Sequence, residues 1–195
     1  MKLKLPEKLE PFRGIILFAV VLMISNLVWK YNVLGDEAID LHSKVTLFGW
    51  DISGPFIAAA VHVATVCKNL LNFLGWEVSL SPDNTLGFAT GYSVKVIWAC
   101  TGIKQAFICS CIFLFARGTW KKKAWYIPLT LLVVYTFNIF RISFITACIE
   151  HHPNWFEFLH LYAFKYAFYG VIFLMWVLWE EKIVGSPTSK TLQEN

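Results

Sequence analysis

Apolar residues fall in blocks of about 20 along this chain, separated by short polar segments. A block of that length is what a helix needs to cross the hydrocarbon core of a bilayer. Four blocks are clear, and they cover residues 12–29, 99–116, 124–149 and 156–179. The pattern therefore predicts an all-α integral membrane protein.

A fifth apolar block, residues 55–75, contains His62 and Lys68, so its placement is open. Counting it gives a bundle of about five transmembrane helices. If it spans the membrane, loop 30–54 is cytoplasmic and the basic N-terminus lies outside. If the N-terminus is inside, the block is re-entrant or lies along the outer interface.

Residues 76–98 change to an alternating apolar and polar pattern around the turn residues 81–84. Alternation over a short segment with a turn in the middle is typical of a β-hairpin. We expect a small β-hairpin on the outer face of the helical bundle.

The composition supports a membrane location: 57% of the 195 residues are hydrophobic and 15% are charged. Soluble domains are closer to 45–50% apolar and about 25% charged. The net charge of +4 lies mostly in short clusters beside the apolar blocks, and no nucleic-acid-binding motif is present. We expect no nucleic-acid partner.

The strongest topological signal is the basic loop formed by Arg117 and Lys121–Lys123. Positive charges next to membrane-spanning helices favour the cytoplasmic side. We therefore expect a multi-pass protein of the plasma (inner) membrane. Residues 1–184 are predicted to form one membrane domain, and the polar segment 185–195 a disordered C-terminal tail.

The five cysteines are an odd number and include no pair at zinc-ligand spacing. The sequence therefore predicts neither a disulfide framework nor a metal site. No motif suggests a cofactor.

Three chemically reactive side chains are predicted at one depth. Cys100 precedes Arg117 by about 26 Å of helix, and Arg141 lies equally far along the following antiparallel helix. His160 enters the last helix from the same outer side. An arginine inside a membrane segment is costly and is a functional candidate by default.

These side chain types suit cysteine-dependent acyl transfer. A thiolate at Cys100 is the nucleophile, His160 moves protons, and Arg141 stabilises an oxyanion. Five further residues are predicted to support the site: Thr101 and Gly102 through free backbone N–H groups at a helix start, Lys104 through its charge, and Asn138 and Gln105 through hydrogen bonds.

Two motifs resemble those of the exosortase/archaeosortase family. Ala99-Cys100-Thr101-Gly102-Ile103 is similar to the family's nucleophile motif, and Asn138-Ile139-Phe140-Arg141-Ile142 to its Asn-x-x-Arg-Ile motif. His160 corresponds to the family histidine, although His151 or His152 could take its place. The resemblance covers about residues 76–180.

The resemblance implies a membrane-embedded cysteine protease or transpeptidase. Its substrates would be exported proteins with a C-terminal sorting tail, made of a short motif, a spanning helix and a basic end. A thioester on Cys100 would pass the protein to a lipid- or glycan-linked acceptor. Two alternatives remain open: an anion transporter using Arg141, and a non-catalytic subunit of an export or polysaccharide system.

Overall fold

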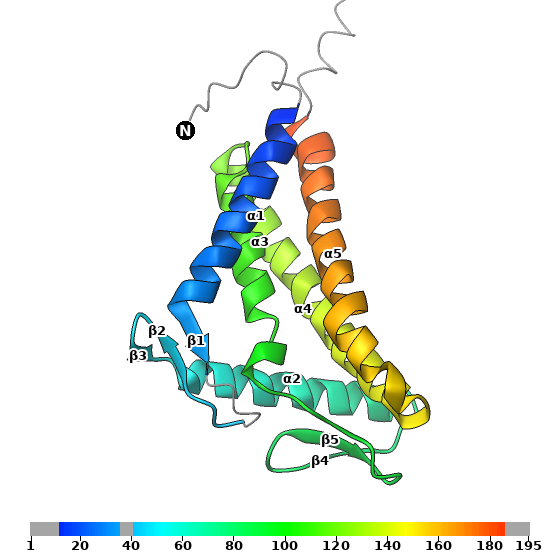
Figure 1. Ribbon diagram of the computed structural model, residues 1–195. Coiled ribbons are helices and arrows are strands. Elements are labelled where there is room, and N and C mark those ends of the chain that lie inside the picture. Colours follow the sequence, from blue (N-terminus) through cyan, green and yellow to red (C-terminus); the bar gives the residue numbers. More distant parts are fainter. Residues whose placement is uncertain (1–11, 36–40, 186–195) are drawn as a thin grey trace, which may run out of the picture.

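The computed structural model describes residues 12–35 and 41–185 and is mostly helical, as expected (Figure 1). The described residues contain five α-helices: α1 (Arg13–Asn32), α2 (Ser53–Phe73), α3 (Ile103–Phe115), α4 (Trp120–His151) and α5 (Phe164–Leu178). Four helices in this part of the chain are long and apolar enough to cross a membrane: α1, α2, α4 and the continuous helix 153–184, which contains α5. Helix α3 is shorter. The prediction of an α-helical membrane protein is confirmed.

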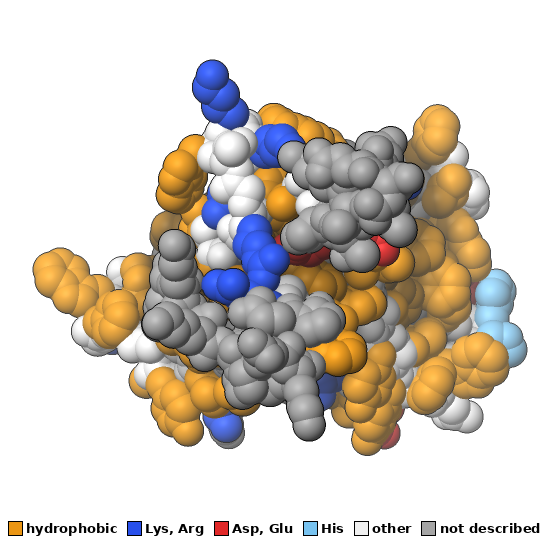
Figure 2. Space-filling view, turned by 90° about the horizontal axis from the view of Figure 1, so that it is seen from above, with side chains coloured by type: hydrophobic (Ala, Val, Ile, Leu, Met, Phe, Trp, Pro, Cys, Tyr) orange, Lys and Arg blue, Asp and Glu red, His pale blue; other side chains and the backbone are white. Residues whose placement is uncertain are grey.

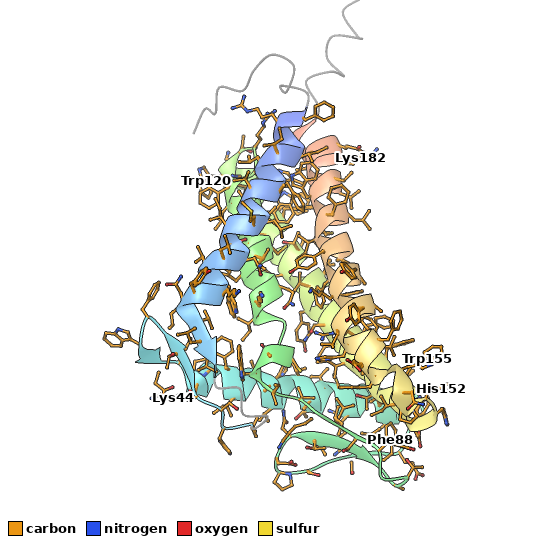
Figure 3. All side chains as sticks on the ribbon, in the orientation of Figure 1. Lys44, Phe88, Trp120, His152, Trp155 and Lys182 are labelled. Carbon is orange, nitrogen blue, oxygen red and sulfur yellow. The ribbon has the colours of Figure 1, made fainter. Side chains whose placement is uncertain are left out.

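The helices α1, α3, α4 and α5 run between the same two ends of the molecule, whereas α2 lies across one end (Figure 1). The end opposite α2 carries Trp120 and Lys182, and the end near α2 carries Lys44, Phe88 and His152 (Figure 3). We call the first the basic end, because the loop Arg117–Lys123 lies there, and the second the sheet end. The crosswise course of α2 favours the interfacial alternative for residues 55–75.

The buried residues of α2 recur every three or four positions, which places them on one face of the helix. That face packs on α4 and on strands of the neighbouring sheet, with Val63, Cys67 and Leu71 against Leu86 and Ile139. His62 stays exposed, and its Nε2 lies 3.0 Å from the Tyr135 hydroxyl on α4. A one-sided apolar face explains how α2 can lie across the bundle.

The predicted hairpin is present and carries a third strand. Strands β4 (Val78–Leu80), β5 (Thr85–Phe88) and β6 (Ser93–Lys95) form an antiparallel meander in sequence order. Asn84 turns the chain before β5 at φ 65° and donates from Nδ2 to the Val96 carbonyl at 2.6 Å. This bond ties the turn to the segment that leads into Cys100.

A second small sheet occupies the region predicted to be only a polar loop. It contains β1 (Val33–Gly35), β2 (Val45–Leu47) and β3 (Trp50–Asp51), paired antiparallel in that order. Strands of two or three residues are too short to show an alternation in the sequence. A Cβ at Gly35 would lie 2.0 Å from the Trp98 ring, so glycine allows this sheet to contact the segment before Cys100.

The main apolar core lies between α1, α3, α4 and α5 toward the basic end. Phe113, Phe168 and Trp179 are fully buried there. The Trp179 indole N–H donates to the Arg117 carbonyl at 2.8 Å and so fixes the last helix to the basic loop. The helices therefore converge at the basic end (Figure 1).

Several predicted boundaries differ from the observed ones. α4 begins four residues earlier and ends two later than predicted. Its 32 residues extend about 48 Å, more than the roughly 30 Å of the hydrocarbon core, so α4 must tilt or project beyond the bilayer. The last helix includes two π-helical stretches, η4 (Phe158–Ala163) and η5 (Trp179–Val184). Of the predicted tail 185–195, residues 186–195 lie outside the described residues.

Candidate active site

Cys100 lies in a short 3₁₀ turn, η2 (Trp98–Cys100), and not in the helix predicted over 99–116. Its backbone N–H donates to the Ile97 carbonyl at 2.9 Å, and the Thr101 N–H and hydroxyl both donate to the Trp98 carbonyl. The Cys100 thiol is free and half-buried. A hydrogen-bonded turn therefore holds the cysteine where it remains accessible.

Gly102 separates this turn from α3. It adopts φ 78°, in the left-handed region, and a Cβ there would lie 3.1 Å from Cγ of Asn138. Only glycine meets both conditions without strain. The prediction that Cys100 starts the helix is wrong for this reason, because α3 begins at Ile103.

This correction changes the expected role of the neighbouring backbone. The N–H of Thr101 was predicted to be free near the sulfur, but it is used inside the 3₁₀ turn. The cysteine also precedes the first turn of α3, so the helix dipole acts on it less directly than predicted. Activation of the thiol then depends more on side chains from other helices.

Asn138 on α4 holds the cysteine turn. It is fully buried, and its Nδ2 donates to the Cys100 carbonyl at 2.8 Å. Its Oδ1 is buried without a hydrogen-bond partner in the described structure. This amide therefore joins α4 to the turn and leaves one acceptor oxygen directed into the protein interior.

Arg141 follows Asn138 by one helical turn and lies in the same layer. Its Nη2 is 3.4 Å from Nδ1 of His160, and its guanidinium is close enough to the Cys100 thiol for an electrostatic interaction. Nε of Arg141 is buried, and no group in the described residues accepts a hydrogen bond from it. The guanidinium thus has a donor available for a further ligand.

His160 lies within the π-helical stretch η4. Its ring stacks on Phe156 with centroids 5.3 Å apart and an interplanar angle of 10°. Short π-helical segments inside helices are often found at functional sites. Phe156 was not predicted as a site residue, although its position four residues before His160 is the spacing of neighbours on a helix.

The two alternative histidines lie elsewhere. His151 contacts the Trp76 ring and His152 stacks on Trp155, and both imidazoles are exposed. Of the three histidines, the structure brings His160 to Arg141. This geometry favours His160 over His151 and His152 as the histidine of the site.

Lys104 and Gln105 lie in the first turn of α3, and Cys100 precedes that helix. Their supporting roles stay predictions. The electrostatic neighbours of Lys104 are Lys165 on α5 and Lys30 on α1. Within the described residues Gln105 makes no hydrogen bond to the site.

The site combines a thiol, a guanidinium and an imidazole with a buried amide that positions the first of them. Such a set can perform nucleophilic acyl transfer, with a proton carrier and a cation for a developing oxyanion. Within the described residues there is no group of three His, Cys, Asp or Glu side chains that could hold a metal ion.

Comparison with known proteins identifies the family of this chain. Neither the curated proteins nor the solved structures yield a match to this chain. The family model described as transmembrane exosortase matches residues 46–179, which include α2, the sheet β4–β5–β6 and every residue of the candidate site. Because the match covers more than half of the sequence, the chain belongs to the transmembrane exosortase family.

Proposed function

We propose that the protein is a membrane-embedded cysteine transpeptidase that cleaves C-terminal sorting tails of exported proteins. One observation carries the proposal: Asn138 and Arg141, one turn apart on α4, contact the Cys100 carbonyl and His160 respectively. A merely structural cysteine needs neither a fixed turn nor a buried cation beside it. Membership of the transmembrane exosortase family supports the same reaction class.

The contact between Arg141 and His160 has a consequence for the proton on the imidazole. A guanidinium only donates hydrogen bonds, so Nδ1 must accept in this contact and the proton of a neutral ring is on Nε2. For His160 to act as a base through Nδ1, Arg141 must turn away. The substrate carbonyl oxygen is the acceptor toward which it would turn.

In the first half-reaction the thiol proton passes to His160 and the Cys100 sulfur attacks the carbonyl carbon of the scissile peptide. Arg141 donates to the resulting oxyanion. The tetrahedral intermediate collapses, the C–N bond breaks, and the imidazolium gives its proton to the departing amine. The exported protein is then joined to Cys100 as a thioester and the tail is released.

In the second half-reaction an acceptor amine attacks the thioester carbonyl and loses a proton to His160. The C–S bond breaks, an amide forms, and the thiolate recovers the proton as a thiol. Water in place of the amine gives the free carboxylic acid. A lipid- or glycan-linked amine suits a site that lies toward the sheet end of a membrane-spanning bundle.

The arrangement also fits a substrate that arrives as a helix within the membrane. Positive charge at the basic end favours the cytoplasmic side for that end, which supports a site near the outer face of a plasma membrane. A tail with a short motif, one spanning helix and a basic end would align its motif with the site.

The proposal is tested with the full-length protein in membranes and a co-expressed exported protein carrying such a tail. Neutral hydroxylamine intercepts thioesters, so it should convert the processed substrate into a C-terminal hydroxamate that intact mass measurement detects. Cys100→Ala should abolish this product, and Cys111→Ala, which removes a similarly half-buried thiol, should retain it. Hydroxamate formation by the Cys100→Ala variant would refute the proposal.

A further inference from the structure

A groove of about 780 Å³ lies between α1 and α3, away from the cysteine turn. Its α1 wall runs from Arg13 to Val28, and its α3 wall from Phe107 to Phe115. It ends at the basic loop, with Arg117 and Gly118. This cavity is therefore associated with the basic end and is distinct from the candidate active site.

The walls are apolar for most of their length. On α1 the lining residues recur at helical spacing, which makes one continuous stripe that includes Leu17, Val20, Ile24 and Val28. From Arg13 to Val28 the stripe extends about 23 Å. Each leaflet contributes roughly 15 Å to the hydrocarbon core, so the stripe is long enough to follow an acyl chain through one leaflet.

The end of the groove is positively charged. Arg13, Arg117 and Lys123 line it, and among the described residues no Asp or Glu does. Glu180 on η5 interacts with Arg117 and offsets part of this charge. Seen from this end, Lys and Arg side chains gather near the middle of the face, with Asp or Glu beside them (Figure 2).

Lys123 is the most enclosed of these cations. Its Nζ donates to the Leu114 carbonyl at 2.7 Å, which satisfies one of the last carbonyls of α3, and lies 5.1 Å from the centre of the Trp120 ring. An ammonium group has three N–H donors, so this carbonyl uses one of them. The positive charge is thus held at the mouth of an apolar groove.

We propose that this groove binds one anionic phospholipid, with the phosphate at Arg13, Arg117 and Lys123 and an acyl chain along α1 and α3. The ligand must be amphipathic, anionic at one end and apolar along the rest. A membrane lipid of the leaflet at the basic end has this order of charge and hydrocarbon.

The charge disfavours a sorting tail as the occupant. Such a tail would bring its basic end to the three cations and be repelled. The groove is therefore separate from the path of the substrate.

The test uses the purified full-length protein in detergent, stripped of lipid and then titrated with phosphatidylglycerol or phosphatidylcholine. Native mass spectrometry reports the bound lipid. We expect one phosphatidylglycerol to bind in preference to phosphatidylcholine, and excess glycerol 3-phosphate, which lacks acyl chains, to leave it in place. Equal binding of the two lipids, or displacement by glycerol 3-phosphate, would overturn the proposal.

Matched variants locate the site. Arg117→Gln should weaken phosphatidylglycerol binding about five-fold, since one cation near a membrane surface contributes about that much. Lys121→Gln removes an exposed charge at the same end that does not line the groove, and should have little effect.

A second pair tests the apolar wall of the groove. Val20→Trp should block the acyl chain, whereas Met23→Trp, exposed on another face of α1, should not. Equal effects within either pair would contradict the assignment.

Discussion

The side-chain amide of Asn138 donates a 2.8 Å hydrogen bond to the backbone carbonyl of Cys100, across 38 residues of sequence. The same amide packs against Gly102, whose left-handed conformation begins the path into α3. One turn further along α4, Arg141 lies beside His160. A single stretch of α4 therefore positions the cysteine turn and supplies the cation.

Replacing Asn138 should disturb the position of the thiol without removing any reacting group. Asn138→Ala loses one buried hydrogen bond, worth about 1 kcal/mol of unfolding free energy. We expect a larger effect on chemistry, with iodoacetamide alkylation of Cys100 slowed several-fold. Alkylation is followed by peptide mass spectrometry.

Thr136→Ala provides the control for Asn138→Ala, because Thr136 lies on the same helix and its hydroxyl bonds only the Leu132 carbonyl in its own helix. It should leave the alkylation rate of Cys100 unchanged. If Asn138→Ala lowers stability but does not alter this rate, Asn138 is a packing residue only.

Gly102→Ala should be destabilising for two separate reasons. Alanine at φ 78° is strained, and its Cβ would meet Asn138 at 3.1 Å, so a cost of about 1–3 kcal/mol is expected. Tail processing should fall as well, because the turn that holds Cys100 must move. Thermal unfolding in detergent and processing in membranes measure the two effects.

The matched control is Gly170→Ala in the middle of α5, where a Cβ would meet nothing within 4 Å. There alanine should stabilise the helix by about 0.5–1 kcal/mol and leave processing intact. Similar losses at both glycines would show that the Gly102 turn has no special role.

Arg141 and His160 should show large losses of activity without loss of stability. Arg141→Leu removes the oxyanion donor and should slow tail processing about 10²–10³-fold. Because it also removes a costly charge from the membrane segment, the melting temperature should stay the same or rise. His160→Gln should reduce processing comparably.

His152→Gln is the control for His160, since His152 is exposed and stacks on Trp155 away from Arg141. It should process tails at the wild-type rate. A severe defect in this variant, together with normal activity of His160→Gln, would show that His152 and not His160 transfers the proton.

The crosswise course of α2 predicts a specific membrane topology. Lys44 precedes α2 and Ser81 follows it, so cysteines at both positions should react with a membrane-impermeant maleimide from the same side. A cysteine at Lys121 should react from the other side. The three single-cysteine variants are compared in a background in which the native cysteines are replaced by serine.

If α2 instead crossed the membrane, Lys44→Cys and Ser81→Cys would be labelled from opposite sides. That result would require the N-terminal part of the chain to be inverted relative to the arrangement described for α1. The experiment thus decides between the two alternatives that the charge pattern left open.

The helices could be predicted from the sequence because apolar length is a strong local signal. The crosswise placement of α2 could not, since a helix with one buried face and a spanning helix can share the same mean hydropathy. The sheet β1–β2–β3 has strands too short to reveal themselves by alternation. Its position depends on long-range packing of Trp98 over Gly35.

The candidate site was predictable because helix length converts sequence separation into depth, and this places Cys100, Arg141 and His160 in one layer. The local conformation at Cys100 was not. Gly102 follows a helix-compatible sequence, and its positive φ goes together with the close approach of Asn138 from another helix. The roles of the three residues in catalysis stay predictions.

The most direct test of the account is the position of the covalent intermediate. Full-length protein in membranes is mixed with a tail-bearing substrate in the absence of an acceptor amine, quenched in acid and digested for mass spectrometry. The account predicts a hydroxylamine-sensitive acyl adduct on the peptide containing Cys100, and no adduct in Cys100→Ala. Unchanged tail cleavage by Cys100→Ala, with no adduct on the wild-type cysteine, would contradict it.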